Sequence, residues 1–306
     1  MDNDKHLVED EKNNSKKRGC SYWSVLFAIL FACLGKCVSS EIKKNALEEN
    51  AEKYRQENTR MTESLSSDDK SNMYVKEAVY SLMDRLPIEF PGIGKVKRIS
   101  YYGEYVIFEI SIKEDASYGL LVEKINEKIE LAEEVIMTCL GIQDEDIKNE
   151  IKVIAEQSCN LTIEIKGNSS QRIGFVHLSP DKLKRALTQS HFSSSEEASL
   201  GMTALTTRLM LPVQVNQVTT WIDTRLTKTS FMYVYNLDDK EIDWKYVDKG
   251  MMKEEQISIL RQNKDVMGKV IRCCIITHRN LVYRYVGSSS KKNVDVTLTD
   301  KDLSNL

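Results

Sequence analysis

Hydrophobic and polar positions follow two different periods between residues 73 and 306. A period of two, typical of half-buried strands, predicts strands over 95–102, 105–112, 218–226 and 230–237. A helical period from Val122 to Leu140 predicts one long amphipathic helix, with Gly141 as its C-cap. Shorter helical stretches follow, each ahead of a further alternating segment. The pattern is therefore one of hairpins separated by helices.

The same order of elements occurs twice, which indicates an internal duplication. Between Asn160–Leu183 and Asn280–Leu303, eight of 24 positions are identical at a constant shift of 120 residues. Upstream the shift becomes 125, and Leu86-Pro87 matches Leu211-Pro212. Each copy is expected to contain a leading helix, a hairpin, helices, a second hairpin and a short capped helix. The caps are predicted at Ser179-Pro180 and at Thr299.

These elements predict an α+β fold. We expect two tandem duplicated domains, over 73–190 and 191–306, each with a mainly antiparallel sheet of about four strands and helices packed on one face. Alternating strands argue against a parallel sheet that is buried on both sides.

The amino-terminal part has a different character. Residues 1–20 are polar and carry Lys16-Lys17-Arg18, and an apolar run follows from Tyr22 to Gly35. This arrangement predicts a cytoplasmic tail over 1–20 and a signal peptide or membrane anchor over 21–39, with the rest of the chain outside the cytoplasm. Residues 40–72 are polar and are interpreted as a tether.

Four outcomes remain open for residues 21–39. The segment is retained as a membrane anchor, is cleaved near Val38-Ser39-Ser40, or is lipidated on Cys33 within a sequence that resembles a lipobox. In the fourth outcome it is a buried helix of a cytosolic protein, which its apolar character on all sides disfavours.

Composition narrows the function classes. The 306 residues include 43 Lys and Arg against 46 Asp and Glu, a net charge of −3, which gives no electrostatic signature of nucleic-acid binding. Only 4 His are present, so a His-rich metal site and catalytic dyads have little to draw on. No G-x-S-x-G or H-E-x-x-H motif occurs, and we assign no catalytic, cofactor-binding or metal-ligating residues.

Aromatic residues gather on the predicted strands. An exposed sheet face carrying them would bind a peptide or a glycan, whereas ordinary strand composition would place them in the core. The candidate binding surface consists of Tyr101, Trp221, Tyr233, Tyr235, Tyr283 and Tyr285.

Cys139 and Cys159 flank one predicted helix of the first domain. In an oxidising compartment they are candidates for a disulfide, and the alternative is a pair of buried thiols.

The second half resembles small exported bacterial proteins of unknown function, over about residues 205–303. The resemblance lies in Leu211-Pro212, Thr219-Thr220, Tyr233-Val-Tyr235 and Tyr283-Arg-Tyr285. It implies a bacterial envelope setting and brings no catalytic residues.

The sequence therefore predicts a bacterial envelope protein that is attached to the cell membrane, or else is secreted or lipid-anchored, and has a binding or structural role. A protein or peptide is a possible partner. The alternatives are an exported enzyme of the hydrolase class and an exported effector acting on a host.

Overall fold

The computed structural model of the chain describes residues 73–306, with gaps at 113–115, 168–172, 189–191, 239 and 241–243. The expected membrane segment 21–39 and the tether 40–72 lie outside the described residues. Within the described part, none of the helices combines the length and the apolar character that crossing a bilayer requires. The described residues form two compact units, divided between Met210 and Leu211.

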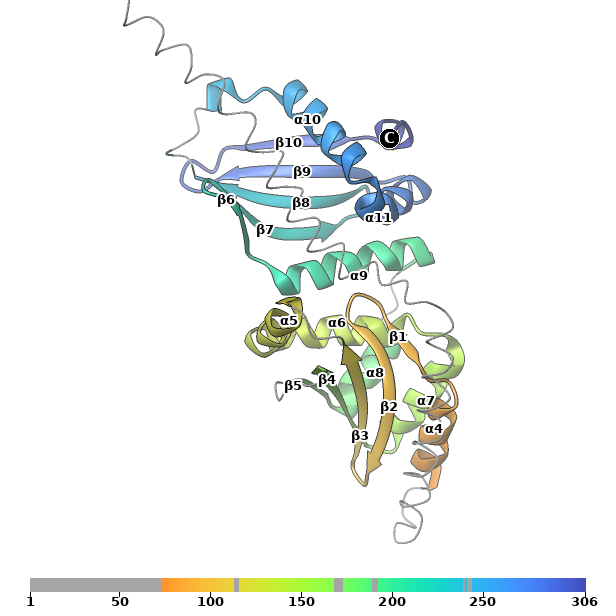
Figure 1. Cartoon of the computed structure of the whole chain (residues 1–306). Coiled ribbons are helices and arrows are strands. Elements are labelled where there is room, and N and C mark those ends of the chain that lie inside the picture. The colour runs from red at the N-terminus through yellow and green to blue at the C-terminus, as the bar shows by residue number, and fades with distance from the viewer. Residues whose placement is uncertain (1–72, 113–115, 168–172, 189–191, 239, 241–243) are drawn as a thin grey trace, which may run out of the picture. The chain divides into compact units, whose positions relative to one another are not determined.

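The first unit contains five strands and six helices among its described residues (Figure 1). Its elements are, in chain order, α4 (Met73–Met83), β1 (Ile88–Phe90), β2 (Gly94–Tyr102), β3 (Tyr105–Ile112), α5 (Ala116–Glu127), α6 (Ile129–Gly141), α7 (Glu145–Glu156), β4 (Asn160–Gly167), β5 (Ile173–Leu178), α8 (Pro180–Thr188) and α9 (Ser195–Met210).

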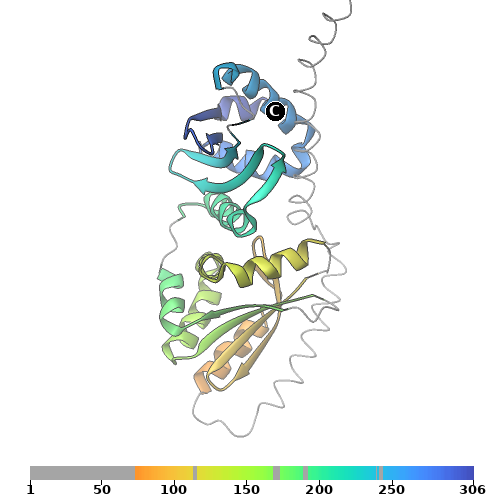
Figure 2. The same cartoon turned by 90° about the vertical axis from the view of Figure 1, so that its left-hand side faces the viewer.

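The second unit repeats much of this order. Its described elements are β6 (Val213–Asn216), β7 (Thr219–Leu226), β8 (Ser230–Leu237), a 3₁₀ turn over Trp244–Tyr246, α10 (Lys249–Gln262), α11 (Lys264–Ile276), β9 (Asn280–Gly287), β10 (Asn293–Leu298) and α12 (Asp300–Ser304). In each unit the strands lie side by side in one sheet, with helices packed against it (Figure 2).

Both sheets have the same topology, which confirms an α+β fold with two mostly antiparallel sheets. The strand orders are β1-β2-β3-β4-β5 and β6-β7-β8-β9-β10, and in each sheet the single parallel pair, β3 with β4 or β8 with β9, lies between antiparallel pairs. Parallel neighbours need a crossover connection, and the helices between β3 and β4 and between β8 and β9 provide it. Each sheet has five strands instead of the expected four, because a short strand follows each Leu-Pro pair.

The registers of the two sheets correspond residue by residue. Tyr105 pairs with Asn160 and Ser230 with Asn280, as shifts of 125 and 120 require. The irregularity between Val96 and Arg98 in β2 recurs between Trp221 and Asp223 in β7. These pairings define equivalent positions in the two units.

The helices that precede β4 and β9 correspond in the same way. The Gln143 side chain donates to the Cys139 carbonyl at the end of α6, and the Asn263 side chain donates to the Ile259 carbonyl at the end of α10, both at 2.8 Å. Ser158 and His278 both have a positive φ where the chain leaves α7 and α11. Thus α6 is equivalent to α10, and α7 to α11.

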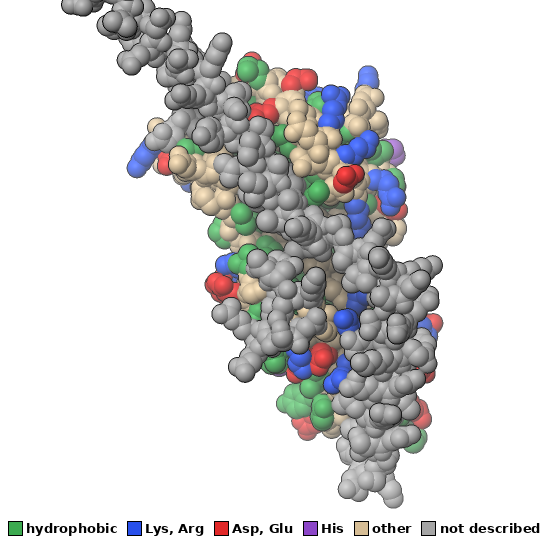
Figure 3. Space-filling model, viewed as in Figure 1, with side chains coloured by type: hydrophobic (Ala, Val, Ile, Leu, Met, Phe, Trp, Pro, Cys, Tyr) green, Lys and Arg blue, Asp and Glu red, His purple; other side chains and the backbone are tan. Residues whose placement is uncertain are grey.

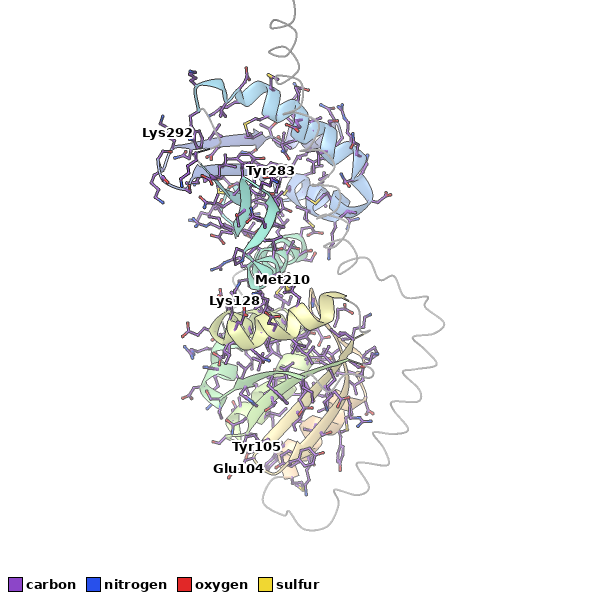
Figure 4. The ribbon with its side chains drawn as sticks, turned by 60° about the vertical axis from the view of Figure 1, so that its left-hand side comes forward. Glu104, Tyr105, Lys128, Met210, Tyr283 and Lys292 are labelled. Atoms are coloured by element: carbon purple, nitrogen blue, oxygen red, sulfur yellow. The ribbon has the colours of Figure 1, made fainter. Side chains whose placement is uncertain are left out.

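The long helix expected from Val122 to Leu140 is divided into α5 and α6. The break falls at Lys128, whose ψ of 55° is not helical. The Lys128 ammonium donates to the carbonyl oxygens of Arg208 and Leu209 near the end of α9, both at 3.1 Å, and Figure 4 shows Lys128 close to Met210. The break therefore coincides with tertiary contacts between residues about 80 positions apart. Sequence periodicity is a local property and does not predict such contacts.

The first unit has an aliphatic core. Inward positions of its strands alternate with half-buried or exposed ones, and Ile99, Phe108, Ile110 and Ile163 are fully buried together with one side of each helix. Burial of apolar area of this kind is the dominant stabilising term in folding.

Candidate functional site

The interior of the second unit contains a cluster of tyrosines among its aliphatic residues. Tyr233 and Tyr235 alternate along β8, and Tyr283 and Tyr285 lie beside them on β9. The ring centroids of Tyr235 and Tyr285 are 5.2 Å apart and those of Tyr233 and Tyr283 are 5.5 Å apart. Trp221 of β7 adds an edge contact to Tyr233, at 5.3 Å. We call Trp221 and the four tyrosines the aromatic interior; Figure 4 marks Tyr283 within it.

The helices contribute polar groups to the same space. The Gln256 side chain of α10 is buried, and its amide nitrogen donates to the hydroxyl of Tyr285 at 3.2 Å. Cys274 of α11 is buried and lies close enough to Tyr233 and Tyr283 to interact electrostatically with both. The aromatic interior is therefore enclosed by groups that can form hydrogen bonds.

The first unit provides an internal control, because equivalent positions there are apolar. At nine inward or half-buried positions the second unit has an aromatic, hydroxyl, amide, carboxyl or thiol group where the first unit has an apolar side chain. The pairs are Val96 and Trp221, Ile99 and Thr224, Phe108 and Tyr233, Ile110 and Tyr235, Val135 and Glu255, Ile136 and Gln256, Ile154 and Cys274, Ile163 and Tyr283, and Ile165 and Tyr285.

Five polar side-chain atoms of the second unit, three of them at these positions, are buried without a hydrogen-bond partner among the described residues. They are the hydroxyls of Tyr283 and Thr224, the hydroxyl of Thr219, the side-chain oxygen of Gln256 and the indole nitrogen of Trp244. Leaving a buried polar group unpaired costs about 1–3 kcal/mol. Since the first unit has isoleucine at the positions of Thr224, Gln256 and Tyr283, the cost at these three positions is not required by the architecture.

Burial disfavours the charged forms of the ionisable groups of this interior. It raises the pKa values of Tyr233, Tyr235, Tyr283 and Tyr285 above the ordinary tyrosine value, so these hydroxyls remain protonated and able to donate. Burial also raises the pKa of Glu255. For Cys274, burial raises the pKa to about 12, which leaves the thiol protonated at neutral pH and therefore a poor nucleophile.

The helix over this interior is less firmly anchored than its equivalent. Six residues of α6 are buried, five of them apolar or thiol side chains, whereas the buried residues of α10 are Gln256, Ile259 and Leu260. In the first unit Ile125 of α5 also lies against Gly174 of β5. The described residues at the matching place in the second unit form the 3₁₀ turn over Trp244–Tyr246. Thus α10 buries fewer apolar side chains than α6 does.

The expected exposed aromatic surface is corrected by these positions. Tyr101, Trp221, Tyr233, Tyr235, Tyr283 and Tyr285 are each exposed by 3% or less. Five of the six meet in the aromatic interior, and Tyr101 lies in the core of the first unit. They face inward because strand alternation gives each sheet one side toward its helices, and the large rings fill that side.

The expected disulfide is also corrected, because Cys139 and Cys159 are free, buried thiols. The Cys139 sulfur lies 3.9 Å from the Pro91 carbonyl oxygen, before β2, and the Cys159 sulfur lies 3.6 Å from the Gly103 carbonyl oxygen, after it. The nine residues of β2 separate these points by about 30 Å. A disulfide needs Cα atoms about 4.4–6.8 Å apart.

Glu255, Gln256 and Thr224 were not among the sequence candidates. The run Glu254-Glu255-Gln256 resembles a solvated helix face when it is considered alone. At the shift of 120, Val135 and Ile136 stand at the positions of Glu255 and Gln256. This replacement of apolar by polar residues is the sequence signal that would have identified the two residues as candidates.

The described residues contain no group of three or more His, Cys, Asp or Glu side chains placed to hold a metal ion. Acidic and basic side chains are interspersed over the described surface seen in Figure 3. Comparison with known proteins gives no match to a protein-family model, to a curated protein or to a solved structure. The candidate site therefore depends on the internal comparison of the two units.

Proposed function

We propose that this chain is a membrane-attached binding protein whose second unit holds a small ligand in the aromatic interior, while the first unit has a structural role. The observation that carries the proposal is the unpartnered hydroxyl of Tyr283, at the position where the first unit has Ile163. Polar groups that reduce stability and are not needed by the fold are typical of sites kept for function.

The chemistry of the interior favours a neutral ligand with hydrogen-bond acceptors on a compact ring. The tyrosine hydroxyls are protonated donors, and the rings offer flat apolar surfaces. Cys274 is held as a thiol, so it offers no thiolate nucleophile to a bound ligand. Entry would occur by displacement of α10, the helix with the fewest buried apolar residues over the site.

The proposal includes a common origin of the two units, supported by the shared strand order and register. After duplication one unit kept an aliphatic core, and the other became the binding unit.

Membrane attachment through residues 21–39, with both units outside the cytoplasm of a bacterial cell, is supported by the basic flank Lys16-Lys17-Arg18. We expect the full chain to sediment with membranes after a high-salt wash, and a freely soluble chain would contradict the attachment.

Binding is tested by thermal unfolding of the full chain with a panel of phenols, nucleobases and aromatic amides. Two of the three tryptophans, Trp221 and Trp244, lie in the second unit, so with Trp23→Phe as the background chain the fluorescence reports the unfolding of this unit. A ligand at about 100 times its Kd is expected to stabilise this unit by about 2.7 kcal/mol.

The matched control replaces Gln256 and Tyr283 by the residues that remove their polar groups, Gln256→Ile with Tyr283→Phe. Compounds that stabilise the parent chain are expected to lose their effect on this variant. Equal stabilisation of the variant, or a panel without any stabilising compound, would contradict the proposed site.

A further inference from the structure

The side of the second sheet opposite the tyrosines carries an apolar cluster of its own. Met232 and Val234 of β8 pack with Val282 and Val286 of β9. We call these four residues the valine face. Met232, Val234 and Val282 are exposed by only 9%, 5% and 6%.

The equivalent side of the first sheet is charged. Glu109 stands where the second unit has Val234, and Lys166 where it has Val286. The Lys166 ammonium lies 2.8 Å from a Glu109 carboxylate oxygen and 2.5 Å from a Glu164 carboxylate oxygen. A charged cluster of this kind is typical of a sheet side in contact with water. The apolar valine face is not typical of such a side.

Burial on both sides distinguishes the central strand β8. Seven of its eight residues are buried, whereas β3 alternates between buried and more exposed positions. Strands buried on both sides are typical of sheets covered on both sides. The described helices α10 and α11 lie on the tyrosine side of the sheet, as the contacts of Gln256 and Cys274 show. An ion pair between Lys253 and Asp302 joins α12 to α10.

We propose that the valine face is the docking site of the apolar segment Tyr22–Val38 of the same chain whenever that segment is not in a membrane. This segment contains the long apolar run of residues 1–72. As a helix, the run Tyr22–Gly35 would be about 21 Å long, comparable to the width of four or five strands. Covalent linkage gives it an effective concentration in the millimolar range, well above that of a second copy at micromolar protein.

Insertion into a bilayer and docking on the valine face are mutually exclusive for one segment. The valine face therefore shields the segment in water, and membrane insertion uncovers the face. This inference is independent of a ligand in the aromatic interior, because the two sites lie on opposite sides of the sheet.

The test is a cysteine cross-link in the full chain. Cys33 and Cys37 lie within the segment, and Val234→Cys places a thiol on the valine face. The control is Glu109→Cys, the equivalent position of the first sheet. Under mild copper-phenanthroline oxidation without detergent, we expect at least a tenfold higher yield of the intramolecular cross-link for Val234→Cys than for Glu109→Cys.

Peptide mass spectrometry identifies the bonded cysteines, and Val282→Cys serves as a second variant should Val234→Cys unfold. Equal yields from the two sheets, or cross-links joining two copies, would overturn the proposal. Vesicles of phosphatidylcholine and phosphatidylglycerol are expected to abolish the intramolecular product by drawing the segment into the bilayer. If vesicles leave the yield of this product unchanged, membrane insertion and docking on the valine face are not mutually exclusive, and that part of the proposal is refuted.

Discussion

Removing the polar groups of the aromatic interior is expected to make the second unit more stable. In the triple variant Gln256→Ile, Tyr283→Phe and Tyr285→Phe, both partners of the buried hydrogen bond disappear together with two unpartnered oxygens. Since each unpaired buried polar group costs about 1–3 kcal/mol, we expect a gain of about 2 kcal/mol. For a unit of this size that corresponds to a rise of about 10 °C in the unfolding midpoint. Tryptophan fluorescence during heating measures it.

The single variant Tyr285→Phe is the matched control. It leaves the Gln256 amide nitrogen without its partner and is expected to lower stability by about 1 kcal/mol. A triple variant that is less stable than the parent chain would show that these groups support the fold, and would remove the basis for a binding site there.

The reciprocal change in the first unit is expected to be severely destabilising. Ile163→Tyr gives the aliphatic core the residue found at the equivalent position of the second unit. Ile163 is fully buried, so the larger ring must displace its neighbours, and its hydroxyl would lie among apolar side chains. Overpacking costs about 1–3 kcal/mol and an unpaired hydroxyl a similar amount, which together predict a loss of about 4 kcal/mol.

Denaturant unfolding followed by far-ultraviolet circular dichroism measures this loss, with the fluorescence transition of the second unit as an internal reference. The control Ile163→Val removes one methylene group and is expected to cost about 1 kcal/mol. A first unit that tolerates Ile163→Tyr as well as Ile163→Val would mean that the two cores are interchangeable, and that the tyrosines carry no information about function.

Much of the fold was predictable from the sequence because alternation along the strands is a local property. The strands over 105–112 and 230–237 have the predicted bounds. The short strands β1 and β6, of three and four residues, carry too little alternation to be recognised. The break at Lys128 accompanies contacts with α9, which a local pattern does not contain.

The site was less predictable than the fold for a physical reason. A period of two shows that Tyr233 and Tyr235 share one side of a strand, but in β8 the alternate residues Met232 and Val234 are also apolar. The choice of side therefore depends on which helices pack there. Gln256 is recognised as a site residue only in the structure. Its amide donates to the Tyr285 hydroxyl, and the alignment of α10 with α6 shows that the first unit has isoleucine at the same position.

The most direct test of a binding interior in the second unit is native-state hydrogen exchange, which compares the amides of α10 with those of α6. Since α10 buries fewer apolar side chains, we predict that it opens locally at a free-energy cost at least 2 kcal/mol lower, so that exchange is about 30 times faster. Equal protection of the two helices would contradict the account, because a closed α10 would leave no route to the tyrosines.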